Sequence, residues 1–166
     1  MGFEAFRVEL RSGRADFSEV DEVVRRVPHI QPDRESALVP GWTDYVYHDG
    51  QHAIELELSD KPVRVSCRFT LCHPPSVDAV FLALVRDLMT RLGMEAKICD
   101  DVRPEHARFF ALGDFADFAA ATLHYITARR AEWIGAFGDE LMAATTNEVY
   151  QRIILPRCQP GTQQPT

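Results

Sequence analysis

Strict alternation of apolar and polar side chains over Val63–Leu71 constrains the fold of this chain more than any other feature of its sequence. The two alternating sets are the apolar Val63, Val65, Cys67, Phe69 and Leu71 and the polar Arg64, Ser66, Arg68 and Thr70. Because successive side chains of a strand point to opposite faces of a sheet, this segment predicts a strand with one buried and one polar face. The chain is therefore expected to form a sheet that is covered on one side.

Other segments carry weaker strand patterns. Phe3–Arg11 repeats the alternation, and Glu95–Cys99 is a short apolar stretch that follows a helical segment. Two more strands, Tyr45–His48 and Gln51–Leu58, flank Asp49-Gly50, a pair that favours a two-residue hairpin turn because both residues accept positive φ. Such a turn predicts three facing pairs across the hairpin: Tyr45 with Ile54, Tyr47 with His52, and Asp44 with Glu55.

The helices are predicted from their capping residues and from apolar side chains at helical spacing. The expected helices begin after Asp16, Ser76 and Asp114 and end near Pro28, Gly93 and Phe137. A fourth segment, Val149–Leu155, favours helix over strand, with Thr145 and Glu148 as a capping box. The proline-containing segment Gln31–Gly41 is predicted to be a loop.

The resulting order, β-α-β-β-β-α-β-α with one more possible helix, is that of an α+β protein. We expect an open, mostly antiparallel sheet of about five strands, with two or three helices packed on one face. Residues 1–156 form a single domain in this interpretation, and 157–166 form a mobile tail rich in Pro and Gln. The predicted core contains Val65, Cys67, Phe69, Val80, Phe81, Leu84, Leu88 and Ile98.

The charge of the chain restricts its partners. The 166 residues carry a formal net charge of −7, which disfavours binding to phosphate backbones and to anionic lipid. No apolar run is long enough to span a bilayer, and the N-terminal segment has no export signal. We therefore expect a cytoplasmic protein that binds neither nucleic acid nor membrane, with its four cysteines as free thiols.

No motif of a known catalytic or cofactor site occurs in the sequence. A glycine-rich phosphate loop and a Gly-x-Ser-x-Gly elbow are both missing, so no catalytic residue, cofactor or metal is predicted. His52 is interpreted as a packed strand residue rather than a base.

One cluster forms an alternative interpretation. If Val63–Leu71 and Glu95–Cys99 are parallel strands joined by a helical crossover, Cys72, His73, Cys99 and Asp100 follow strand ends at one edge of the sheet. Thiol, imidazole and carboxylate groups can bind zinc, or act as a cysteine nucleophile with its base. The spacing of these residues matches no metal-binding motif, and Cys67 is expected in the core.

A second candidate site is the polar face of the predicted sheet. Its charged residues are Asp44, Glu55, Glu57, Arg64 and Arg68. Like charges that face each other across strands are unfavourable, and nearby arginines offset part of that cost. This face is either a solvated layer of salt bridges or a surface that binds a partner.

Two stretches of the chain resemble an uncharacterised family of small bacterial proteins. They are Ser66–Pro75, with the sequence SCRFTLCHPP, and Thr145–Pro156, with the sequence TTNEVYQRIILP. In size, acidity and strand-rich α+β build, the chain is also similar to immunity proteins, which neutralise toxins delivered between competing bacteria. That resemblance implies a protein partner and transfers no functional residue.

These observations favour a non-enzymatic domain that binds a protein partner, such as a basic toxin, through the charged sheet face. The alternative is a small enzyme or metal-binding protein. Its site would be the cluster of Cys72, His73, Cys99 and Asp100. A homo-oligomer is left open by the sequence.

Overall fold

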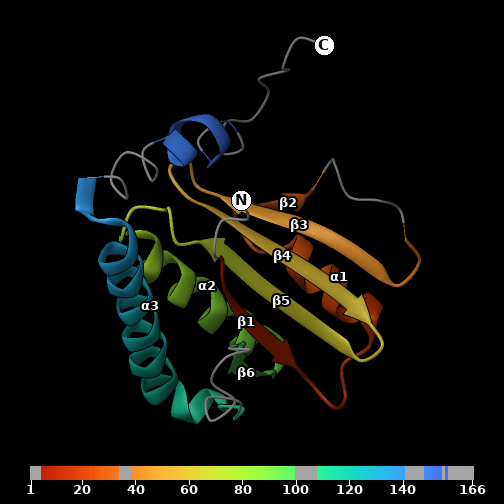
Figure 1. The fold of residues 1–166 in the computed structure, drawn as a ribbon. Helices are drawn as coiled ribbons and strands as arrows, with labels where there is room; N and C mark the ends of the chain where they lie inside the picture. The colour runs from red at the N-terminus through yellow and green to blue at the C-terminus, as the bar shows by residue number, and fades with distance from the viewer. Residues whose placement is uncertain (1–4, 34–38, 100–107, 141–147, 155, 157–166) are drawn as a thin grey trace, which may run out of the picture.

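Six strands form one antiparallel sheet in the order β2-β3-β4-β5-β1-β6 (Figure 1). The computed structural model describes residues 5–33, 39–99, 108–140, 148–154 and 156. The strands are β1 (Ala5–Arg11), β2 (Ile30–Pro32), β3 (Trp42–His48), β4 (Ala53–Asp60), β5 (Val63–Thr70) and β6 (Glu95–Ile98). The predicted α+β class is confirmed. Gln31 and Pro32 belong to the short strand β2, whereas the prolines of Gln31–Gly41 predicted a loop there.

The helices cover one face of this sheet. They are α1 (Phe17–Arg25), α2 (Val77–Leu92) and α3 (Phe115–Phe137), with a short 3-10 turn, η2 (Leu112–Asp114), before α3. A separate π-helical turn, η3 (Tyr150–Ile154), lies near the C-terminus. Figure 1 views the sheet from its other face, so that α1 and α2 lie behind the strands and α3 runs beside α2. The helical prediction for 149–155 is confirmed over its described residues, whereas Thr145 and the tail 157–166 lie outside them.

A cluster of aromatic rings joins the sheet to the helices. The centre of the Phe81 ring on α2 lies 5.5 Å from the centre of the Phe6 ring on β1 and 5.0 Å from that of Phe69 on β5. Tyr125 on α3 contacts the same Phe6 ring at 5.5 Å. Seven of the eight predicted core residues are buried, and Val80 is partly buried against them. The apolar half of the β5 alternation therefore forms the centre of the core.

The connection from β5 to β6 crosses over one strand of the sheet, β1. Both strands are antiparallel to β1, which lies between them, so they are parallel to each other without being neighbours. This placement separates the residues that follow the two strands, a point that bears on the candidate cysteine site.

The β3–β4 hairpin differs from the prediction. Its loop has four residues, Asp49 to His52, because His48 pairs with Ala53. The Asp49 carboxylate accepts the backbone N–H groups of Gln51 and His52, at 2.9 and 2.8 Å, and so stabilises the longer loop.

The longer loop shifts the register of the hairpin by two residues. The observed facing pairs are Tyr47 with Ile54, Tyr45 with Leu56, and Asp44 with Glu57 rather than Glu55. On the next strand Arg68 faces Glu55, and Glu57 faces Ser66 rather than Arg64. Because the shift is an even number of residues, every side chain keeps its predicted face.

The predicted helix starts and the ends of α2 and α3 are correct, whereas α1 ends at Arg25, before the predicted Pro28. The Asp16 side chain accepts the Ser18 N–H at 2.6 Å, as a capping residue should, and Gly93 ends α2 with φ of 61°. Ser76 and Asp114 occupy the N-cap positions of α2 and α3 without making a side-chain cap bond. The Ser76 hydroxyl is instead directed to a histidine.

The core assignment can be tested by truncation. Replacing Phe81 or Leu84 with Ala should lower the free energy of unfolding by about 2–5 kcal/mol, because each leaves a cavity between α2 and the sheet. Urea unfolding measures the change. Leu123→Ala, at an exposed position on α3, is the control and should change stability by less than about 0.5 kcal/mol. Equal midpoints for all three variants would contradict this core.

Candidate functional site

The sheet face opposite α1 and α2 carries the predicted partner-binding residues. We call it the open face. Since the alternate side chains Tyr45, Leu56, Leu58, Val65 and Cys67 are buried toward the helices, the residues between them point to the other side. The five predicted residues that share the open face are Asp44, Glu55, Glu57, Arg64 and Arg68.

Charges on the open face are divided between its two halves. The acidic residues Asp44, Glu55 and Glu57 lie on β3 and β4. The neighbouring strands β5 and β1 contribute the basic residues Arg64, Arg68, Arg7 and Arg11, together with Glu9. The surface is therefore an acidic strip beside a mainly basic one.

One ion pair joins the two strips, and a second lies within the basic strip. Arg68 pairs with Glu55 across β4 and β5, and Arg64 lies 3.7 Å from Glu9 on β1. The side chains of Arg68, Arg64 and Glu55 keep 55%, 38% and 32% of their surface exposed, so solvent still reaches the middle of the face. Ion pairs between side chains that are this exposed contribute little to the free energy of unfolding.

Asp44 and Glu57 face each other as like charges. Burial raises the pKa of the Glu57 carboxyl, and the charge of Asp44 raises it further, while Arg64, Arg68 and Arg7 act in the opposite direction. Asp44 also accepts a hydrogen bond from the indole N–H of Trp42 at 3.0 Å. The acidic strip therefore keeps a pair of carboxylates together at an energetic cost.

An apolar contact and a cation–π contact bound the open face. Val149, just before η3, packs with Val46, Ala53 and Cys72 at the end of the face near the β3–β4 loop. At the opposite end, the guanidinium of Arg11 lies 3.4 Å from the centre of the Phe109 ring. The charged residues between these contacts form the part of the face that remains accessible.

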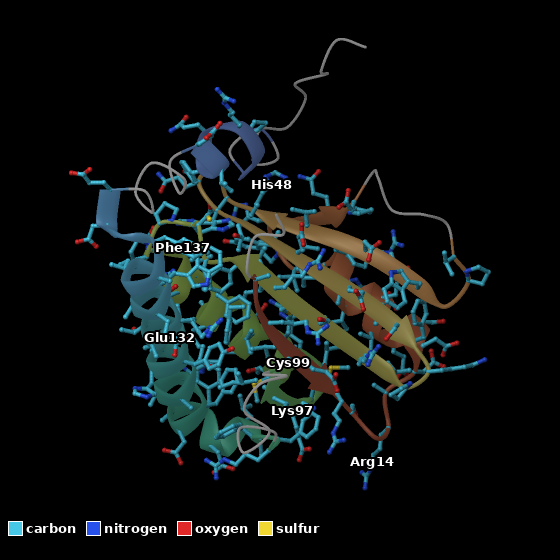
Figure 2. All side chains as sticks on the ribbon, in the orientation of Figure 1. Arg14, His48, Lys97, Cys99, Glu132 and Phe137 are labelled. Atoms are coloured by element: carbon cyan, nitrogen blue, oxygen red, sulfur yellow. The ribbon has the colours of Figure 1, made fainter. Side chains whose placement is uncertain are left out.

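The alternative cysteine cluster is not assembled in the structure. Cys72 is buried in the small cluster with Val149, whereas Cys99 lies beyond β6, with its backbone N–H bonded to the Arg7 carbonyl at 2.9 Å. β1 lies between β5 and β6, which places these strands about 10 Å apart. Figure 2 shows Cys99 with Lys97 beside β1. Asp100 lies outside the described residues.

The thiols of Cys67, Cys72 and Cys99 are free, and two of them are poorly suited to nucleophilic chemistry. Burial raises the pKa of Cys67 to about 12. Burial also raises the pKa of Cys99, and the nearby Arg7 offsets only part of that effect. Because the thiolate is the reactive form, these two residues are largely unreactive at neutral pH.

His73 is engaged by the backbone on both sides of its ring. Its Nε2 accepts the N–H of Ala53 at 3.1 Å, and its Nδ1 donates to the Thr70 carbonyl at 3.0 Å. Burial lowers the pKa of the imidazole, with a smaller contribution from His52. The neutral ring of His73 therefore links the start of β4 to the segment after β5 through two hydrogen bonds.

A chain of three polar residues, Asp49, His52 and Ser76, was missed by the sequence reasoning. The Nδ1 atom of His52 lies 2.9 Å from Asp49 Oδ2, and its Nε2 atom lies 2.8 Å from Ser76 Oγ. Burial opposes ionisation of Asp49, but hydrogen bonds from His52 and from the loop backbone outweigh it and lower the pKa of its carboxyl. His52 is packed as predicted, but it lies in the β3–β4 loop rather than in a strand, and its ring makes two directed hydrogen bonds.

Comparison with family models, with curated proteins and with solved structures found no match for this chain in any of the three. Within the described residues, no group of three or more His, Cys, Asp or Glu side chains is placed to hold a metal ion. No helix in the same part of the chain is long and apolar enough to cross a membrane. The resemblance to immunity proteins stays a prediction.

The placement of Cys72 and Cys99 predicts the metal content of the protein. Because β1 separates them, they cannot join one zinc ion without a change of the sheet. We expect protein purified without added metal to contain far less than one zinc per chain, and a chelator to leave its melting temperature unchanged. One equivalent of zinc that is lost in Cys72→Ser or Cys99→Ser would contradict this expectation.

The buried His73 predicts a pH dependence of stability. Its pKa in the folded protein lies below the ordinary value of 6.5, so the unfolded chain takes up a proton first as the pH falls through that value. The free energy of unfolding should therefore decrease below about pH 6.5. The variant His73→Gln, which can keep both hydrogen bonds, should lose this part of the dependence.

Urea unfolding at several pH values between 5 and 8 measures the difference. His124→Gln on the exposed side of α3 is the control, because it leaves every hydrogen bond of His73 in place. If His73→Gln and His124→Gln depend on pH to the same degree, His73 is not the group responsible.

Proposed function

We propose that this protein is a binding domain that holds a basic protein partner on the acidic strip of its open face. The observation that carries the proposal is the facing pair Asp44 and Glu57, two carboxylates on neighbouring strands of a sheet that the helices leave uncovered. Like charges placed directly opposite each other destabilise a sheet. A partner that contributes Lys or Arg side chains would offset that cost on binding.

The surrounding charges favour a partner of the same kind. The net charge of −7 attracts basic proteins over distances longer than a contact. Arg64 and Arg68 lie immediately beside the acidic strip, so a partner with acidic residues next to its basic ones would meet complementary charges on both strips. This alternation of sign supports one orientation of the complex over others.

A bacterial toxin is the partner class that the sequence resemblance suggests. A toxin that acts on nucleic acid must approach phosphate groups and therefore presents a basic surface. An acidic sheet face can cover such a surface. The proposal is accordingly that the protein neutralises a basic toxin as an immunity protein does.

Charge reversal on the open face tests this proposal. The double variant Glu55→Lys with Glu57→Lys should lower the association rate with the partner about tenfold or more at low salt, and the remaining rate should depend less on salt. The fold should persist, because both side chains are partly exposed. The partner is first captured on immobilised wild-type protein, and its association is then measured by surface plasmon resonance.

The matched control reverses two acidic residues on the helices. Glu22→Lys on α1 with Asp87→Lys on α2 changes the net charge by the same amount on the opposite side of the sheet. This control should keep most of the association rate. Equal rates for the two double variants would exclude the open face as the binding surface.

A further inference from the structure

The Asp49–His52–Ser76 chain has the geometry of a serine nucleophile with its base and orienting carboxylate. A nucleophilic serine requires a base within about 2.6–3.2 Å of its oxygen, and that base is usually held by a third group. Both distances, 2.8 Å from Ser76 Oγ to His52 Nε2 and 2.9 Å from His52 Nδ1 to Asp49 Oδ2, satisfy this requirement. The three residues come from the β3–β4 loop and from the start of α2.

The positions of the protons follow from the chemistry of the partners. An ionised carboxylate only accepts hydrogen bonds, so the His52 ring carries its proton on Nδ1 and directs it to Asp49. The Nε2 atom is then the acceptor, and the Ser76 hydroxyl donates to it. This is the arrangement in which a neutral imidazole can take the serine proton.

The Asp49 carboxylate is itself held in place. Its Oδ1 atom accepts the backbone N–H groups of Gln51 and His52, while Oδ2 faces the imidazole. His52 is 5% exposed, whereas Ser76 is an exposed residue. A fixed, buried base is thus bonded to a serine that is itself exposed to solvent.

The start of α2 is suited to a developing negative charge. The amino end of this 16-residue helix carries the positive end of its dipole. The one carboxylate of its first turn, Asp78, is held by both terminal nitrogens of Arg130 on α3, at 2.6 and 2.9 Å. The negative charge of Asp78 is therefore compensated close to Ser76.

Two exposed apolar side chains of α3 follow Arg130, the residue that holds Asp78. Ile134 and Phe137 follow Arg130 by four and seven residues, which places them on the same side of α3. They are 42% and 55% exposed, and Figure 2 shows Phe137 at the end of α3. These side chains can contact the apolar part of a substrate whose carbonyl carbon lies at Ser76.

We propose that Ser76 is a catalytic nucleophile that accepts a short apolar acyl group from an ester, with His52 as its base and Asp49 as the residue that positions His52. The Ser76 oxygen attacks the carbonyl carbon, and its proton passes to His52 Nε2. The bond to the leaving alcohol breaks, and that alcohol takes the proton from His52. Water then attacks the acyl-serine in the same way, which releases the carboxylic acid and restores the hydroxyl.

Covalent labelling of the wild-type protein tests this activity directly. A fluorophosphonate probe and 4-nitrophenyl butyrate are each incubated with the full chain, and the modified residue is identified by peptide mass spectrometry. Ser76 should be labelled, whereas Ser18, an exposed serine in the first turn of α1, should not. Absence of label on Ser76, or equal labelling of Ser18, overturns the proposal without the need for any variant.

Substitutions then separate the roles of the three residues. Ser76→Ala should abolish both labelling and release of 4-nitrophenol, and Ser18→Ala should change neither. His52→Gln should slow labelling by about a hundredfold or more, since a general base contributes on this scale. Asp49→Asn should also slow the reaction and should change its pH profile, which a purely structural residue would not do. Wild-type rates in His52→Gln, with its fold verified by circular dichroism, would exclude the mechanism.

Discussion

The burial of a single face of β5 is the constraint on which the rest of the structure depends. This strand lies between β4 and β1, and its residues Val65, Cys67 and Phe69 are buried against the helices. Since a slip of one residue would place Arg64 and Arg68 in the core, the register of both neighbouring strands is fixed by this alternation. The aromatic contacts of Phe69 then place α2 over the sheet, and α3 follows through its contact with Phe6.

The same constraint explains why charges gather on the other face. A sheet with helices on one side only must present polar side chains on the other, but it need not place two carboxylates opposite each other. Asp44 and Glu57 do so although burial and their mutual repulsion raise the pKa of Glu57. The arginines Arg64, Arg68 and Arg7 offset part of this repulsion from the neighbouring strands, so the charge balance of the face depends on both strips together.

Local patterns predicted much of the fold. Alternation over Val63–Leu71 identified the central strand, and Asp16 and Gly93 marked helix ends, because these signals depend only on neighbouring residues. The predicted length of the β3–β4 loop was wrong, and the reason also lies in neighbouring residues. Asp49-Gly50 favours a two-residue turn, but the Asp49 carboxylate binds two later amides and lengthens the loop to four residues.

The candidate sites differ in how far the sequence could predict them. Successive residues of a strand point to opposite faces of the sheet, so a residue's face depends only on whether its position in the strand is odd or even. Glu55 and Glu57 were therefore assigned to the correct face even though the register was shifted by two residues. The bond between His52 and Ser76 joins residues 24 positions apart, and neither neighbourhood contains a catalytic motif. Cys72 and Cys99 were expected at one edge, and the insertion of β1 between their strands is a matter of topology that no local pattern encodes.

The two prolines before α2 explain how the Ser76 hydroxyl is left for His52. A serine at a helix N-cap normally accepts a backbone N–H of the first turn. Here the carbonyls of Pro74 and Pro75 accept the N–H groups of Val77 and Asp78, at 3.0 and 3.1 Å. Because prolines have no N–H of their own, they also add no unsatisfied donor to the start of the helix. The backbone therefore satisfies these two amides, and the serine oxygen can point toward the buried imidazole.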